Sequence, residues 1–203
     1  MKYILLCGSN HEKINDVPRQ LVTIKGERIL DRTIRLLREN GINDISVTGT
    51  DNAFKSVDAK FQYYDSAGPW LNCFPPVEDP VCFIFGDVYF SPEAINSIVS
   101  IQTDSVEFFA SGPPFPIKYI KPWAEPFAFK VKNVKYFFEC VAAARAGIAE
   151  GIWQRDPIAW ELWQIIKGTP INHIDYTNYY HINDYTCDID TAADVAKLER
   201  GLT

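Results

Sequence analysis

The chain has 203 residues, of which 47% are hydrophobic and 23% are charged, and its formal net charge is -6 at pH 7. This composition is that of a globular protein, and it excludes intrinsic disorder, collagen and coiled coil. The length suits one domain, residues 1–203. Because the acidic balance lacks the basic surface that nucleic acids and anionic membranes attract, we expect a small ligand and neither of those partners.

Five cysteines stand at wide and irregular spacings. This pattern favours neither a disulfide framework nor a zinc site of the CxxC type, and it fits a reducing cytoplasm. The apolar stretch at 3–7 is shorter than the roughly 7 to 15 residues of a signal peptide. No later run approaches the ~20 apolar residues that span a bilayer. The sequence therefore predicts an untargeted, cytoplasmic protein.

The first fifty residues predict a strand, a loop, a helix and a second strand. Tyr3–Cys7 is an unbroken apolar run that ends at Gly8, which is typical of a strand buried on both faces. A polar loop is expected from there to about Arg19. Apolar residues recur at helical spacing over 28–40, and an apolar-rich strand is expected at 42–48. This order indicates a parallel strand pair and an α/β fold.

The middle of the chain continues the alternation of strands and helices. Short strands are expected at 60–64, 81–85 and 105–110, and the dense apolar run at 81–85 is typical of a central parallel strand. Ser91 is the expected N-cap of a helix that ends near Ser100. These elements predict a three-layer α/β/α sandwich with a mixed, mainly parallel sheet of the Rossmann-like type.

The last third of the chain contains a proline-rich segment followed by helices. Five prolines between 112 and 126 predict a long irregular excursion, either an inserted subregion or an interface arm. The further expected elements are an extended segment at 127–131 and helices at 134–150, from Asp156 onward, and over 191–200.

Several short motifs occur in an order that resembles the nucleotidyltransferase family. The similar segments are Leu5–Ser9 (family LAAGxGxR), Pro18–Leu21 (PKxL), Gly26–Leu30 (GxPLL), Gly86-Asp87 after the central strand, and Asp188–Val195 (DIDTPEDL). The spacing between the first two equals that in the cytidylyltransferases of isoprenoid synthesis. The resemblance covers most of the chain outside the proline-rich middle, and it implies a nucleotide-diphospho-sugar transferase fold, similar to the GT-A fold.

The resemblance implies Mg²⁺-dependent transfer of NMP from an NTP to a small phosphorylated acceptor, a sugar phosphate, with release of pyrophosphate. Such an in-line attack on the α-phosphorus needs charge neutralisation and a metal, and it needs no protein nucleophile. By similarity, the nucleotide-binding residues are Gly8, Ser9, Asn10 and Arg19, the catalytic cations are Lys13 and Arg19, and the metal ligands are Asp87 and Asp190.

The first loop and the PKxL-like segment depart from the family pattern. Asn10 stands where the family has a glycine, and Glu12 stands where the family has the arginine that faces the α-phosphate. Lys13 or His11 could supply that missing cation, and neutral His11 brings less charge than Lys13. Arg19 replaces the family lysine, which keeps the charge but changes its geometry.

Alternatives to this interpretation stay open. The changed loop also fits a non-catalytic nucleotide- or sugar-binding domain of the same fold. A nucleotide-sugar-dependent glycosyltransferase is the enzymatic alternative, although it would want a pair of acids after the central strand, where Gly86–Tyr89 offers only Asp87. Thr191 and Asp194 form a capping-box pattern, so helix capping alone could account for the acidic motif near the C-terminus.

Two aromatic groups have alternative interpretations. Trp153, Trp160 and Trp163 stand at spacings that could line one helix face, and core or dimer packing is preferred for them over ligand stacking. Because dimer packing is one of these roles, a homodimer stays an open alternative. The segment Tyr176–Tyr185 leads into the acidic motif, so it is a candidate wall of the acceptor pocket.

Overall fold

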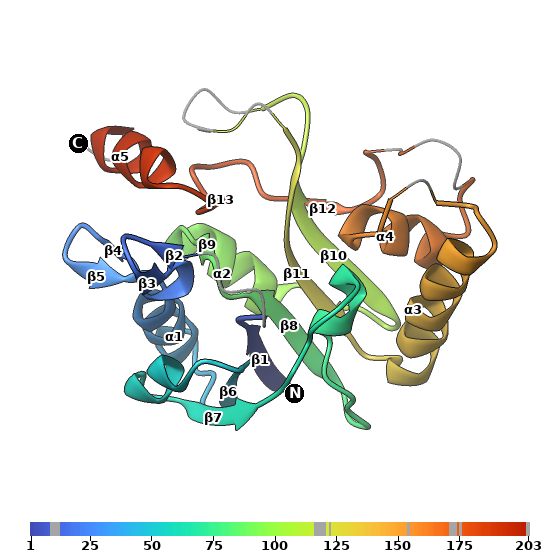
Figure 1. The fold of residues 1–203 in the computed structure, drawn as a ribbon, viewed down its shortest axis with the longest axis horizontal. Coiled ribbons are helices and arrows are strands. Elements are labelled where there is room, and N and C mark those ends of the chain that lie inside the picture. Colours follow the sequence, from blue (N-terminus) through green and yellow to red (C-terminus); the bar gives the residue numbers. More distant parts are fainter. Residues whose placement is uncertain are drawn as a thin grey trace.

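The structure is a computed structural model, and it describes residues 1–8, 13–115, 121, 123–153, 155–170, 174 and 176–201. Its central feature is a seven-stranded sheet (Figure 1). In sheet order, the strands are β12 (Tyr180–His181), β10 (Val106–Ser111), β11 (Glu125–Val131), β8 (Val81–Phe85), β1 (Lys2–Leu6), β6 (Ile45–Gly49) and β7 (Lys60–Tyr63). The strands expected in the first half of the chain are all present.

The sheet is mixed and mainly parallel, as predicted. Strand β11 is antiparallel to both β8 and β10, and every other neighbouring pair in the sheet is parallel. At the centre of the sheet, Leu5 of β1 lies between Val47 of β6 and Ile84 of β8. All three side chains are fully buried. Unbroken apolar strands form here because both faces of a parallel sheet are covered.

Helices cover both faces of the sheet. The bounds are α1 (Ile29–Glu39), α2 (Pro92–Ser100), α3 (Val134–Ala149), α4 (Ala159–Lys167) and α5 (Ala192–Gly201). In Figure 1, α1 and α2 lie on one side of the sheet, α3 and α4 lie on the other, and α5 lies beside the small strands that precede α1. The three-layer prediction is confirmed. None of the helices in the described part of the chain combines the length and apolar character that crossing a bilayer requires.

Local capping explains where these helices begin. The Ser91 side chain accepts a hydrogen bond from the Ala94 N–H, which confirms the predicted start of α2. Helix α4 begins at Ala159, three residues after the predicted start at Asp156. The reason is that Ile158 is extended and its N–H donates to the Glu161 carboxylate at 2.9 Å, which fixes the first turn there.

Residues 13–28, between β1 and α1, contain short strands where the sequence predicted a polar loop to about Arg19. Strand β2 (Lys13–Ile14) pairs with β3 (Val17–Pro18), and β4 (Thr23–Ile24) pairs with β5 (Glu27–Arg28). A short 3-10 helix, η1 (Arg19–Leu21), joins the two hairpins. Ile14 and Ile24 pack in a small second core together with residues of the C-terminal segment. The hairpins thereby bring η1 close to the acidic motif before α5.

Aromatic side chains fill the core between the sheet and α3. Phe74 packs edge-on against Phe83, Phe129 and Phe137, with ring centroids 5.1 to 5.8 Å apart. These rings are fully buried, and such contacts stabilise a core beyond the area that they bury. The cluster fixes the face of β8 and β11 that lies opposite α1 and α2.

Two of the three tryptophans that were expected to line one helix face pack in the core, and the third lies outside the helix. Trp160 and Trp163 are buried in α4 and contact Phe108 of β10. Trp153 lies in the connection after α3, where its indole N–H donates to the Ala144 carbonyl at 2.9 Å. The prediction that all three line one helix face is therefore wrong for Trp153.

Gly86 is the residue on which the end of β8 depends. A Cβ at this position would lie 2.8 Å from Cys7 Sγ and 2.9 Å from the Leu6 carbonyl oxygen. Gly86→Ala should therefore lower the free energy of unfolding by about 1–3 kcal/mol, because the backbone must shift to relieve these contacts. Urea unfolding followed by circular dichroism measures this loss. Gly201→Ala is the control, since no atom of the described residues lies within 4 Å of its Cβ, and equal stability of the two variants would contradict the prediction.

Candidate functional site

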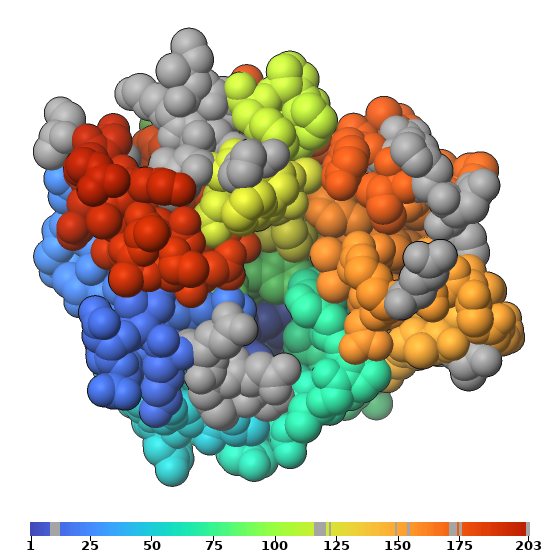
Figure 2. Space-filling model, turned by 45° about the horizontal axis from the view of Figure 1, so that its top comes forward, coloured from blue at the N-terminus to red at the C-terminus, as the bar shows by residue number. Residues whose placement is uncertain are grey.

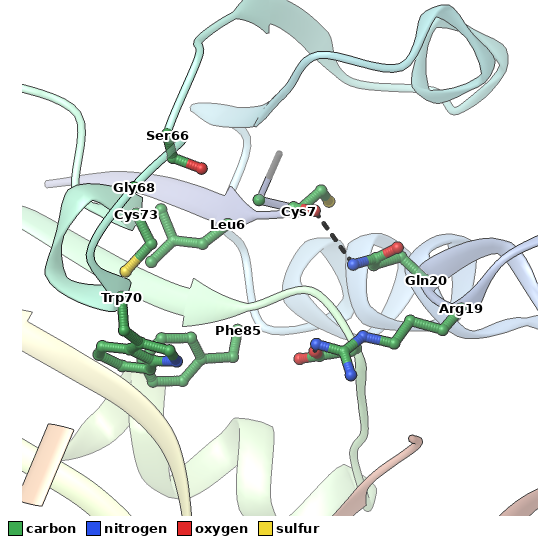
Figure 3. Close-up of a pocket in the computed structure, with 11 residues that line it drawn as sticks. Leu6, Cys7, Arg19, Gln20, Ser66, Gly68, Trp70, Cys73 and Phe85 are labelled. Carbon is green, nitrogen blue, oxygen red and sulfur yellow. Dashed lines mark hydrogen bonds and ion pairs between the residues drawn. The ribbon is translucent and has the colours of Figure 1, made fainter. Parts of the chain in front are cut away.

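A cavity of about 330 Å³ lies at the carboxyl ends of β1 and β8. The space-filling view shows a hollow between α5, the chain that leads into β11, and the segment around residue 70 (Figure 2). Leu6 and Phe85, paired across β1 and β8, contribute to its lining (Figure 3). The carboxyl edge of a parallel sheet is where open α/β proteins bind ligands. Its size suits a small molecule.

One end of the cavity is polar and charged. Gly8, two residues after β1, Arg19 of η1 and Asp87 after β8 line this end. Gln20 lies beside them, and its amide donates a hydrogen bond to the Cys7 carbonyl at 3.1 Å (Figure 3). This bond ties η1 to the end of β1, which fixes the backbone from which the Arg19 side chain extends. Gln20 is a cavity residue that sequence reasoning missed.

Arg19 joins the two predicted metal ligands. Its Nη2 lies 2.7 Å from Asp87 Oδ2, and its Nη1 lies 2.8 Å from Asp190 Oδ1. Burial raises the pKa of the Asp87 carboxyl above its ordinary value, and the Arg19 guanidinium opposes this effect. The structure therefore brings three predicted site residues together, from the N-terminal, central and C-terminal parts of the chain.

Lys121 lies at the centre of a second group of charges next to Arg19. Its side chain is only 2% exposed. The lysine Nζ lies 2.9 Å from Asp188 Oδ1, 2.9 Å from Asp190 Oδ2 and 3.2 Å from Asp194 Oδ2. Glu125 lies slightly farther away, at 3.6 Å. Burial lowers the pKa of Lys121, but hydrogen bonds to Asp190 and Asp188 outweigh it and leave the pKa above its ordinary value.

The charged residues form one group that we call the acidic cluster: Asp87, Glu125, Asp188, Asp190 and Asp194, with Arg19 and Lys121 between them. Five carboxylates surround two cations, so negative charge is in excess when all of them are ionised. Such an excess in a partly buried place favours the binding of a further cation.

The acidic motif near the C-terminus also caps α5. The Thr191 N–H donates to Asp194 Oδ2 at 3.0 Å, and the Asp194 N–H donates to Thr191 Oγ1 at 3.2 Å. The capping-box interpretation is therefore confirmed for this pair. It does not account for Asp190, whose carboxylate contacts Arg19 and Lys121 instead.

The donor set of Asp87 and Asp190 fits a magnesium ion. One oxygen from each carboxylate approaches the same guanidinium, so the two carboxylates face the same position. Mg²⁺ prefers oxygen ligands and is commonly held by one or two carboxylates, with water and phosphate completing the octahedron. Among the residues that the structure describes, no group of three or more His, Cys, Asp or Glu side chains forms a metal site. Two protein ligands would thus leave room for phosphate oxygens.

The remaining predicted residues of the first loop are only partly described. Ser9 and Asn10, together with His11 and Glu12, lie outside the described residues. Lys13 is exposed in β2, and the lining of the cavity comes from other residues. The role of Lys13 stays a prediction.

The other end of the cavity is apolar and aromatic. The short helix η3 (Trp70–Cys73) forms its wall, and the ring centroids of Trp70 and Phe85 lie 5.3 Å apart. The Arg145 guanidinium of α3 holds this wall by donating to the Leu71 carbonyl at 2.9 Å. An aromatic wall at one end and charged side chains at the other suit a ligand with a ring and a charged group.

The two cysteines that line the cavity are not reactive thiolates. Burial raises the pKa of Cys7, and Asp87 adds to the effect. Burial likewise raises the pKa of Cys73. Both thiols therefore stay protonated at neutral pH, and a protonated thiol is a poor nucleophile.

Part of the segment Tyr176–Tyr185 packs beside β10. Tyr179 lies against Phe108 and Trp160, with ring centroids 6.2 and 5.2 Å away, and Tyr180 pairs with Phe109 in the sheet. The described cavity is lined by other residues. A wall of the acceptor pocket at this segment stays a prediction.

No protein-family model and no curated protein matches this sequence. Solved structures share its fold. A crystal structure of the Mycobacterium tuberculosis rv0371c homolog from Mycobacterium sp. strain JC1 has a TM-score of 0.56 and 15% identity, over 99% of this chain and 96% of that chain. HddC from Yersinia pseudotuberculosis, complexed with GMP-PN, has a TM-score of 0.55 and 14% identity, over 100% of this chain and 99% of that chain. At these identities the likeness establishes the fold alone.

The buried lysine makes a testable contribution to stability. Lys121→Met should lower the free energy of unfolding by about 3–5 kcal/mol, because it leaves buried carboxylates without their cation. Lys132→Met is the matched control: this lysine is exposed and pairs with exposed Asp104, so the loss should stay below about 1 kcal/mol. Urea unfolding at neutral pH measures both losses. Equal losses in the two variants would contradict a central role for Lys121.

The effect of Lys121→Met should also depend on pH. Burial raises the pKa of Asp194, but hydrogen bonds from Thr191 and Lys121 outweigh it and lower the pKa below its ordinary value. The stabilisation of ionised Asp194 is thus present above the unfolded-state pKa of about 3.9, and it is lost as the pH falls through the lowered value. The difference between wild type and Lys121→Met should therefore shrink in acid, and a difference that grows would contradict this sign.

Proposed function

We propose that this protein is a Mg²⁺-dependent nucleotidyltransferase that transfers NMP from an NTP to a small phosphorylated acceptor, a sugar phosphate, and releases pyrophosphate. The observation that carries the proposal is the cavity itself. It combines Arg19 and Asp87 at one end with Trp70 and Phe85 at the other, at the carboxyl edge of a parallel sheet, and Asp190 contacts Arg19 beside it.

The fold supports a nucleotide as the ligand of this cavity. HddC, which has the same fold over nearly the whole of both chains, was solved in complex with GMP-PN. In this chain, the aromatic wall formed by Trp70 and Phe85 offers a surface for the nucleobase. Gly8 lines the charged end with a φ of 66°, and its backbone N–H would be the group that approaches a phosphate oxygen.

The proposed reaction needs neutralisation of charge rather than a protein nucleophile. An oxygen of the acceptor phosphate attacks the α-phosphorus in line, the bond to the β-phosphate oxygen breaks, and pyrophosphate leaves with the bonding electrons. Arg19 would donate charge-assisted hydrogen bonds to the phosphates. Asp87 and Asp190 would hold Mg²⁺, which supplies positive charge for the triphosphate oxygens. Lys121 would keep the Asp190 carboxylate in position.

A non-catalytic nucleotide-binding domain is the second candidate. The observation that favours it is Glu12, which places an anion where the resembling family has a catalytic arginine. Both candidates predict nucleotide binding in the cavity. Turnover separates them.

A pyrophosphate-release screen of the four NTPs against phosphorylated sugars and alcohols tests the proposed activity. We expect Mg²⁺-dependent release for at least one pair, and we expect Asp87→Asn to abolish it while the fold stays intact. Asp104→Asn is the control, since Asp104 is fully exposed and pairs only with Lys132 among its described contacts. Full activity of Asp87→Asn would refute the metal assignment. Nucleotide binding without turnover for every pair would favour the binding domain.

The same assay tests Lys13 as the cation that meets the charge on the α-phosphoryl group. Losing such a stabiliser typically lowers kcat by about 10² to 10³, with a smaller effect on ground-state binding. Lys13→Ala should therefore be slow in pyrophosphate release and still bind NTP in calorimetry. Wild-type rates in this variant would eliminate Lys13.

A further inference from the structure

Arg19 lies where the proposed site needs a divalent cation. Its two terminal nitrogens contact one oxygen of Asp87 and one oxygen of Asp190, at 2.7 and 2.8 Å. A guanidinium between these two oxygens fills the space and neutralises the charge that a metal ion would use. The same carboxylates therefore cannot serve Arg19 and Mg²⁺ in this geometry at the same time.

We infer that Arg19 is a latch on the metal position: it holds Asp87 and Asp190 until a triphosphate draws it away, so that the divalent cation and the triphosphate bind together. This inference rests on the proposed function, because that function supplies the triphosphate. The latch sets an order of contacts within the site, and it makes the free protein a weak binder of divalent cations.

The surroundings of Arg19 allow its side chain to exchange partners. Its backbone is fixed by η1, which Gln20 ties to the end of β1, while its side chain lines the cavity and is 22% exposed (Figure 3). A guanidinium matches carboxylate and phosphate oxygens with the same planar set of donors. A triphosphate in the cavity therefore offers Arg19 an equivalent set of hydrogen bonds and more negative charge.

The carboxylates that Arg19 leaves are prepared to take up a cation. Asp190 stays in place because its other oxygen contacts Lys121, and Lys121 is also held by Asp188 and Asp194. Without Arg19, the acidic cluster would have one cation for five carboxylates. Each ligand thus favours the binding of the other, which is a positive coupling between the two.

Arg19 makes this bridge with two nitrogens. The resembling family has a lysine at the position of Arg19, and a lysine carries its charge on one nitrogen. Arg19 reaches the two carboxylates with separate nitrogens, Nη1 and Nη2. Replacement by lysine should therefore weaken the latch without removing the charge.

Binding of Mn²⁺ to the protein alone, measured by electron paramagnetic resonance without nucleotide, tests the latch. Arg19→Met should bind Mn²⁺ about tenfold more tightly than wild type, within the usual range of coupling between sites. Arg38→Met is the matched control, because this arginine pairs with exposed Asp58 away from the acidic cluster, and its Mn²⁺ affinity should equal that of wild type. A folded Arg19→Met variant that binds Mn²⁺ no more tightly than wild type would overturn the latch.

Arg19→Lys covers the case in which Arg19→Met does not fold, as judged by circular dichroism. Its Mn²⁺ affinity should lie between those of wild type and a protein without the latch, so an affinity equal to wild type would overturn the inference.

Calorimetry with CTP, UTP, ATP and GTP in Mg²⁺ separates the two proposals. If wild type turns over and both Arg19 variants bind Mn²⁺ as wild type does, the latch is contradicted and the proposed function stands. If none of the four NTPs binds, the proposed function is contradicted, and so is the exchange of Arg19 onto a triphosphate.

Discussion

The contact of one arginine with two carboxylates holds the candidate site together. Arg19 and Asp190 are 171 positions apart in the sequence, and Asp87 comes from the end of the central strand β8. The guanidinium therefore joins the N-terminal hairpins, the sheet and the segment before α5 at one place. The small second core beneath the hairpins supports this contact, because Ile14 and Leu198 pack in the same cluster.

Lys121 is a second cation that contacts several carboxylates, on the buried side of the site. Carboxylates that leave water need a cation and hydrogen bonds, or their charged form becomes costly. Lys121 supplies a cation to Asp188, Asp190 and Asp194 and donates a hydrogen bond to Asp190, and Glu125 accepts a hydrogen bond from the Asp188 N–H at 3.2 Å. The acidic cluster thus has more carboxylates than cations, and their positions are fixed by these contacts. A metal ion with its triphosphate is a ligand that such an arrangement can accept.

The sequence predicted those features that depend on local patterns. The apolar run Val81–Phe85 and the Ser91 cap were enough to place β8 and α2, because each element carries its own periodicity or end group. Asp87 and Asp190 came from short motifs. The hairpin at 13–18 was missed, since two-residue strands have no period to detect. Lys121 was missed because its partners Asp188, Asp190 and Asp194 lie far along the chain and only tertiary structure brings them to it.

A crystal structure with Mg²⁺ and a non-hydrolysable NTP tests the central claim most directly, namely that this cavity binds a metal–nucleotide complex. We expect the nucleobase beside Trp70, the triphosphate in contact with Arg19, and Mg²⁺ on Asp87 and Asp190. A nucleotide bound outside the cavity would contradict the proposed function. A triphosphate in the cavity with Arg19 still between the two carboxylates would contradict the exchange of partners.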